Sequence, residues 1–347
     1  MRRRVAVAAL LVVIGSGCGR SSAQPTAGCQ LRPVSPAGEV TFVAGGRLIG
    51  VDPAGQGSHC LARLGGMAVT ARWAPGGDRL LVDNRSQRFP GGRHPTGFTG
   101  VDQVAWSRPA GSSLLAVTPG GALIKRPTSG GPARDITFLN RHESAIYHPG
   151  GQAIVSVGFL DGYGIYLADN TGKPLATLAR SETARHIGPL TWTAEGDLVF
   201  AAQHDDRWDI HRLVLATGRL STLGSTGTAT AAITDLVASP FASGDVAWRQ
   251  RDCDAGTAST TVFEGGNRVA LPPAVGAATP LGWLPGGALE LQRPRSICGP
   301  GGGRGDVYTF NHGTAIRLGV ASRGVALRVA LPPGPRLPAT LPSDAPI

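Results

Sequence analysis

The sequence predicts an all-β chain in which a small four-stranded sheet repeats around a ring, the architecture of a β-propeller. Three observations favour this class: abundant turn residues, a strand-turn-strand phrase that recurs at a regular spacing, and alternating outer strands. The 347 residues include 51 glycines and 27 prolines, well above the roughly 7% and 5% that are usual. Few windows are free of Gly and Pro, which excludes helical bundles. A hydrophobic share of 41% is enough for a core and excludes wholesale disorder.

The recurring phrase is an apolar strand that ends near an aromatic residue, a turn of Pro-Gly or an equivalent pair, and a second apolar strand. Successive copies are separated by 33, 41, 45, 46 and 45 residues. A period of about 40 to 45 residues with short strands is typical of a propeller blade. The copies are anchored at Trp73, Trp106, Tyr147, Trp192, Ala238 and Trp283. Because the tryptophans repeat with the fold, we expect them in the core between blades.

Two further strands follow the clearest copies and complete a blade. Residues 164–169 and 174–178 follow the Tyr147 copy, and residues 208–214 and 220–223 follow the Trp192 copy. Apolar and polar residues alternate in these outer strands, as in half-buried antiparallel strands.

The two ends of the repeat region complement each other. Residues 39–64 contain three strands without a preceding turn phrase, and residues 325–331 form one strand with none after it. We expect these N- and C-terminal strands to share a blade and close the ring, which removes exposed sheet edges. Six anchors plus this shared blade predict seven four-stranded blades. The short second repeat leaves six blades, with an irregular loop at residues 86–100, as the alternative.

One turn carries a resemblance to a known family. Trp73-Ala-Pro75-Gly76-Gly77-Asp78-Arg79 resembles the Trp-Ser-Pro-Asp-Gly phrase, followed by Lys or Arg, of TolB-type and WD-repeat-like propellers. The other copies mostly replace the turn aspartate with Gly or Glu. The resemblance covers residues 38–331 and implies the propeller fold. It implies no particular activity, since propellers host unrelated functions.

The N-terminal sequence predicts a location outside the cytoplasm. Three arginines, an apolar run at residues 5–14 and the small residues Gly15-Ser16-Gly17 form the layout of a secretory signal, and the apolar run is too short to span a bilayer. Cys18 follows directly, and the junction resembles a bacterial lipobox in which Gly15 replaces the usual Leu. We therefore expect residues 1–17 to be a removed lipoprotein signal peptide and Cys18 to carry palmitate-type chains that anchor the protein to the cell membrane. A plain cleaved signal is the alternative.

The other boundaries follow from composition. Residues 18–37 are expected to be a flexible tether, residues 38–331 the propeller domain, and residues 332–347 a disordered Pro-rich tail. The formal net charge is +10, but only two of the 33 basic residues are lysines. The basic residues are scattered, with no run longer than Arg2-Arg3-Arg4. This pattern indicates a GC-rich bacterial genome and disfavours nucleic acid as a partner. A monomer is expected.

Four cysteines remain after Cys18. Cys253 lies 13 residues after Pro240, and Cys298 lies 13 residues after Pro285, so both occupy equivalent points of neighbouring repeats. The register predicts a Cys253–Cys298 disulfide, which leaves Cys29 to pair with Cys60. Four free thiols are the alternative.

Catalytic motifs are absent from the sequence: it contains no Gly-x-Ser-x-Gly, no His-Glu-x-x-His and no phosphate-binding loop. No cofactor is expected. His204, Asp205 and Asp206, with Asp209 and His211 nearby, are weak candidates for metal ligands, and a solvated loop is the favoured interpretation.

The sequence therefore favours a non-enzymatic propeller scaffold that binds a protein or a cell-envelope component through loops on one face. The alternative is a metal-dependent hydrolase or lyase, similar to propeller lactonases, with its site in the central channel. That site would need several acidic or histidine side chains converging on the channel.

Overall fold

A computed structural model describes residues 28–64, 71–82, 85–88, 98, 101, 103–298 and 304–347. The predicted signal peptide and the predicted lipidation site at Cys18 lie outside the described residues. Within the described residues, all regular structure is β, with 28 strands and no α-helix. No helix in these ranges has the length and apolar character needed to cross a bilayer.

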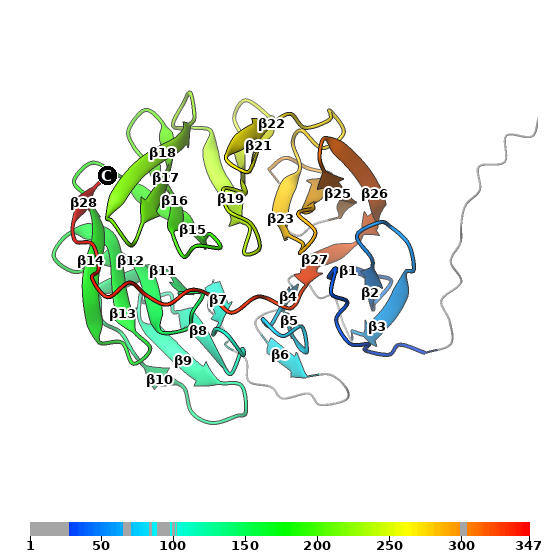
Figure 1. Ribbon diagram of the computed structural model, residues 1–347, viewed down its shortest axis with the longest axis horizontal. Helices are drawn as coiled ribbons and strands as arrows, with labels where there is room; N and C mark the ends of the chain where they lie inside the picture. The colour runs from blue at the N-terminus through cyan, green and yellow to red at the C-terminus, as the bar shows by residue number, and fades with distance from the viewer. Residues whose placement is uncertain are drawn as a thin grey trace, which may run out of the picture.

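The strands form seven sheets around a common axis (Figure 1). From the axis outward, three of the sheets are β27 (Arg323–Arg328), β1 (Glu39–Ala44), β2 (Arg47–Val51) and β3 (His59–Arg63); β4 (Ala71–Trp73), β5 (Arg79–Val82) and β6 (Arg85–Arg88); and β7 (Gln103–Trp106), β8 (Ser113–Val117), β9 (Leu123–Pro127) and β10 (Arg134–Asp135).

The other four sheets are β11 (Arg141–Tyr147), β12 (Ala153–Phe159), β13 (Tyr163–Asp169), β14 (Pro174–Ser181) and β28 (Ala345–Pro346); β15 (His186–Trp192), β16 (Leu198–Gln203), β17 (Trp208–Val214) and β18 (Arg219–Ser225); β19 (Ala232–Ala238), β20 (Val246–Asp252), β21 (Thr257–Glu264) and β22 (Asn267–Val269); and β23 (Thr279–Trp283), β24 (Leu289–Pro294), β25 (Gly305–Asn311) and β26 (Thr314–Ala321).

The number of complete blades corrects the sequence prediction. Six sheets have four strands or more, and the sheet β4-β5-β6 has three described strands. The prediction of seven four-stranded blades is therefore wrong, and the structure has six. The reason lies in the short second repeat: only 33 residues separate Trp73 from Trp106, and residues 90–97 lack the apolar alternation of an outer strand.

The tryptophan anchors lie in the core, as predicted. Trp73, Trp106 and Trp192 are 8–9% exposed and Trp283 is 1% exposed. The first of them also joins neighbouring sheets, because the Trp73 indole N–H donates to Thr41 Oγ1 on β1 at 2.8 Å. These side chains bury large apolar areas at the inner ends of the blades.

The turn glycines have backbone conformations that explain their recurrence. Gly77, Gly151 and Gly196 follow the inner strands β4, β11 and β15 and have φ values of 66°, 76° and 83°. Other residues rarely adopt this region. We call this end of the ring, where inner strands end in Pro-Gly-type turns, the turn face; the opposite end, where inner strands begin, is the loop face.

The first and last strands of the ring lie in one sheet. β27 pairs antiparallel with β1, with Val40 opposite Leu327 and Thr41 opposite Ala326. The Arg328 side chain, 1% exposed, lies at the end of this pairing. Its guanidinium donates to Gly77 O at 2.8 Å and to Arg32 O at 2.6 Å, and it lies 3.1 Å from Glu39 Oε2.

The C-terminal segment corrects another expectation: residues 332–347 are not a disordered tail. They cross the ring to the sheet of β11–β14, where β28 pairs in parallel with β14 (Figure 1). Asp344 Oδ1 accepts from Arg180 Nε at 2.8 Å, and the Ile347 N–H donates to Arg180 O at 3.0 Å.

Apolar residues explain why this Pro-rich segment is ordered. Leu337, Leu341 and Ile347 are partly buried against the core cluster between the β11–β14 and β15–β18 sheets. The segment also follows the turn face: the Leu331 N–H donates to Pro75 O at 3.0 Å, and Pro335 fills the space where a Cβ on Gly196 would lie. Prolines reduce the conformational entropy that such a segment loses on docking.

Candidate functional site

A polar pocket of about 300 Å³ opens on the loop face, at the beginnings of the inner strands β7, β11 and β15. The turns covered by the C-terminal segment are at the other ends of β11 and β15. Polar lining side chains are contributed by Gln103, Thr118, Arg141, His142, Glu143 and His186. The ring places the beginnings of these inner strands next to one another, and this brings the polar residues together. Their spacing in the sequence did not reveal it.

Glu143 is the centre of the polar contacts in the pocket. Its Oε2 accepts a hydrogen bond from the Tyr163 hydroxyl at 2.8 Å and lies 3.7 Å from His186 Nδ1. The Tyr163 oxygen accepts from the Ile187 N–H at 2.8 Å. Burial, and then the neighbouring carboxylate, raise the pKa of Tyr163, so its phenol stays protonated and acts as a donor. Glu143 and His186 keep exposed side-chain surface and can contact a partner.

His142 lines the same pocket but is fully committed to the fold. Its Nε2 accepts from the backbone N–H groups of Phe138 and Leu139 at 3.3 and 3.2 Å, so Nδ1 carries the proton and donates to Ser156 Oγ at 2.7 Å. Burial lowers the pKa of His142 to about 4, and Asp135 opposes this effect. The neutral imidazole therefore holds the beginning of β11 in place and offers no free nitrogen to a ligand.

A second cavity, of about 430 Å³, lies inside the ring between the inner strands β4, β15, β19, β23 and β27. Val329 and Leu331 of the C-terminal segment also line it. The lining is mainly apolar, and the charged groups on it are Arg72 and Asp235. Arg72 donates to Val104 O at 2.9 Å, and Asp235 accepts from Thr234 Oγ1 at 2.8 Å. The described lining of this cavity thus supplies one carboxylate and no imidazole.

The weak metal candidates of the sequence are separated by the structure. Asp205 is 77% exposed and pairs with Arg185, whose Nε lies 2.6 Å from Asp205 Oδ1; Asp206 is 73% exposed and pairs with Arg207 at 3.3 Å. His204 instead approaches Asp209 and His211, and the three ligand atoms lie within 4.8 Å of one another. The alternation of β17 puts Asp209 and His211 on one side of the strand, a signal that the sequence contained.

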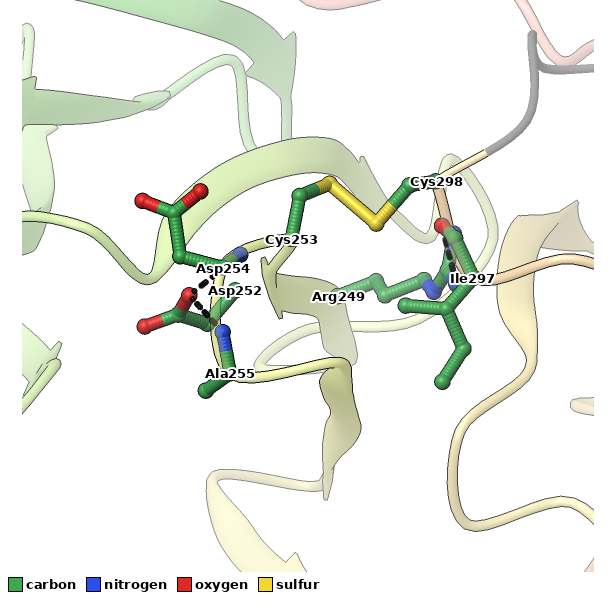
Figure 2. The surroundings of a disulfide bond; sticks show 7 residues. All are labelled: Arg249, Asp252, Cys253, Asp254, Ala255, Ile297 and Cys298. Atoms are coloured by element: carbon green, nitrogen blue, oxygen red, sulfur yellow. Dashed lines mark hydrogen bonds between the residues drawn. A yellow bond between two sulfur atoms is a disulfide. The ribbon is translucent and has the colours of Figure 1, made fainter.

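Both predicted disulfides are present in the structure. Cys253 follows β20, Cys298 follows β24, and their bond joins the two adjacent blades on the loop face (Figure 2). Beside it, the buried Arg249 side chain donates to Ile297 O at 3.4 Å (Figure 2). Cys29 bonds Cys60 in β3.

The Cys29–Cys60 bond attaches the N-terminal segment to the ring. The Gln30 N–H donates to Cys60 O at 3.0 Å, and Arg32 O accepts from Arg328. Part of the segment expected as a flexible tether, residues 28–37, is therefore held against the propeller. Val34 packs close to Gly77, which places this stretch at the turn face.

Comparison with known proteins finds similarity only to solved structures. No family model matches the chain, and no curated protein matches it. Among solved structures it is similar to TolB from Acinetobacter baumannii, with a TM-score of 0.48, 14% identity, and coverage of 84% of this chain and 67% of that chain. It is similar to the β-propeller domain of Cps50 (Swd1) from Myceliophteria thermophila, with a TM-score of 0.47, 15% identity, and coverage of 74% and 86%.

A further similar structure is hydrazine synthase from Kuenenia stuttgartiensis, with a TM-score of 0.50, 14% identity, and coverage of 70% of this chain and 76% of that chain. At this level of identity the likeness concerns the fold alone. The sheets around one axis by themselves define the chain as an all-β propeller.

The buried histidines predict how stability depends on pH. Burial lowers the pKa values of His142 and His148 to about 4, whereas an unfolded histidine has a pKa of about 6.5. Between these values the unfolded state binds more protons, so the free energy of unfolding falls as pH drops from 6.5 to 4. Each histidine contributes up to about 3 kcal/mol to this loss.

Urea unfolding at pH 7 and pH 4.5 measures this loss. We expect His142→Gln to lower stability at pH 7 but to reduce the difference between the two pH values. His312→Gln is the matched control, because the His312 side chain is 85% exposed. An unchanged pH difference in His142→Gln would contradict the assignment.

Proposed function

We propose that the protein is an extracytoplasmic, membrane-tethered lipoprotein whose propeller binds a protein or a cell-envelope component at its loop face, without catalysing a reaction. The observation that carries this proposal is the difference between the two faces. The N-terminal segment and residues 331–342 cover turns of the turn face, whereas the loop face carries an open polar pocket.

The path of the N-terminal segment supports an orientation on the membrane. Residues 28–38 follow the turn face, where Gly38 packs against Leu284, Pro285 and Val329. The chain from Cys18 to Gly28, ten Cα-to-Cα steps, reaches at most about 35 Å when fully extended. A lipid-modified Cys18 would therefore hold the turn face nearest the membrane, and the loop face with its pocket would point away from it.

The two disulfides support a location outside the cytoplasm, where such bonds persist. The sheet shared by β1 and β27 also fits a ring closed by its terminal strands. A closed ring with both ends docked presents a rigid surface to a partner, and rigid scaffolds lose little entropy on binding.

The pocket's chemistry favours a polar group as its occupant. Arg141 contributes a positive charge, Glu143 a negative charge and His186 an imidazole at the same opening. A volume of about 300 Å³ is at the small end of ligand pockets. It accommodates a side chain or a small headgroup of a larger partner, as expected for a docking site.

The competing hypothesis of a metal-dependent hydrolase or lyase requires several acidic or histidine side chains around the channel. In the cavity between the inner strands, Asp235 is the acidic lining residue, and its carboxylate is bonded to Thr234. The ring cavity therefore favours binding over this type of catalysis.

Photo-crosslinking on both faces tests the binding proposal. A photoreactive phenylalanine analogue at Arg141, on the loop face, is expected to capture an envelope component in intact cells. The same analogue at Arg336, in the C-terminal segment on the turn face, is the matched control and is expected to capture none of that component. Equal capture at both positions, or capture only at Arg336, would contradict the proposed face.

Fractionation of Cys18→Ala tests the anchor. Because this change removes the thioether that would carry the lipid, we expect the protein to move from the membrane pellet to the soluble fraction, while Ser22→Ala stays in the pellet. Retention of Cys18→Ala in the pellet after a high-salt wash would show that the lipid anchor is not what holds the protein.

A further inference from the structure

Three potential metal ligands gather on the loop-face side of the β15–β18 sheet, away from the cavity in the ring. His204 belongs to the turn between β16 and β17, which is closed by a hydrogen bond from the His204 N–H to Arg207 O at 2.8 Å. Asp209 and His211 belong to β17 and, two residues apart, point to the same side of the strand. The ligand atoms of the three side chains lie within 4.8 Å of one another.

An unsatisfied nitrogen provides an independent indication of a ligand. His211 is 8% exposed, and its Nε2 is buried without a hydrogen-bond partner. Its Nδ1 lies 3.4 Å from Thr222 Oγ1. When Nδ1 carries the proton and donates to this hydroxyl, the ring is held in place and Nε2 has a free lone pair. Buried polar atoms nearly always have a partner, and a metal ion would supply the missing one.

We propose that His204, Asp209 and His211 form a binding site for Zn²⁺ or a similar divalent transition-metal ion. Two imidazoles and one carboxylate are a ligand set that suits zinc, with solvent at the fourth position. Ligands about 2.0 to 2.2 Å from a tetrahedral zinc lie roughly 3.3 to 3.6 Å apart.

The existing distances need little change for such a site. His204 Nε2 is already 3.6 Å from Asp209 Oδ2, which matches the separation of two zinc ligands. The widest separation, within 4.8 Å, has to close by about 1 Å. His204 lies in a turn, so its side chain can adjust when a metal binds.

Arg207 gives the site a distinctive prediction. Its Nε lies 3.1 Å from Asp209 Oδ2, the oxygen that faces His204. The guanidinium therefore competes with a cation for this carboxylate and repels it. The Arg207 side chain is 48% exposed and can turn into solvent when a metal binds. Removing it should tighten metal binding rather than weaken it.

Isothermal titration of ZnCl₂ into the untagged full chain, stripped with EDTA and dialysed, tests the proposal. We expect one Zn²⁺ per chain, an affinity at least about tenfold weaker in His204→Ala and in Asp209→Asn, and a tighter affinity in Arg207→Ala. Asp205→Asn is the matched control, because this exposed carboxylate of the same turn pairs with Arg185, and its affinity should equal that of the wild type.

His204→Ala is the decisive variant because its partly exposed side chain can be removed with little effect on folding; its melting temperature without metal should match the wild type. Co²⁺ added in place of Zn²⁺ should give the intense visible absorption of a tetrahedral site in the wild type and lose it in His204→Ala. No saturable Zn²⁺ binding by the wild type, or equal binding by His204→Ala, would overturn the proposal. Either result leaves the proposed binding role of the loop face untouched.

Discussion

The buried guanidinium of Arg328 is the contact on which the arrangement of the terminal segments depends. A charge this deeply buried is tolerated only when it is paired and hydrogen-bonded. Arg328 meets this requirement with groups far apart in the sequence: the Glu39 carboxylate, the carbonyl oxygens of Arg32 and Gly77, and the ring of Trp73, whose centroid is 4.9 Å away. It therefore joins the last ring strand to the N-terminal segment and to the next sheet.

This joint determines how the two faces of the ring differ. The N-terminal segment is held at the turn face by Arg328 and by the Cys29–Cys60 bond, and the C-terminal segment leaves β27 at the same end. The N-terminal segment and residues 331–342 thus lie along the turn face, with Pro335 against the turns after β11 and β15. The last residues then run along the outer strand β14 toward the loop face. The opposite face keeps the Glu143–His186 pocket and the Cys253–Cys298 bond. The contacts of one buried charge are consequently linked to which face of the ring the N-terminal segment covers.

Features that repeat with the blade could be predicted from the sequence. The Trp anchors and the register of Cys253 with Cys298 depend on a period, and a period is visible in one chain. The C-terminal segment could not be predicted, because its prolines suggest disorder while its docking depends on an apolar cluster shared by two sheets, which only the fold creates. The second sheet differs for a related reason: the weak outer-strand pattern after Gln87 left the blade count open.

Buried polar groups were the main limit of the sequence-based account. Glu290 alternates with apolar residues in β24 and resembles a solvent-facing position, yet it is 0% exposed and only its Oε1 accepts a hydrogen bond, from Thr309 at 2.8 Å. Burial raises the pKa of Glu290 to about 8. In the candidate sites, sequence adjacency favoured Asp205 and Asp206 beside His204, whereas strand alternation selects Asp209 and His211. The loop-face pocket combines three sheets and has no signature in any one segment.

Urea unfolding of Arg328→Ala tests the central role of this joint most directly. Removing the guanidinium leaves the Glu39 carboxylate buried without its main partner, so the free energy of unfolding should fall by about 3 to 5 kcal/mol. Arg317→Ala is the matched control: Arg317 pairs with Asp306 at 2.6 Å on an exposed strand, and its loss should change stability by less than about 1 kcal/mol. An Arg328→Ala protein as stable as the Arg317→Ala control would contradict the account.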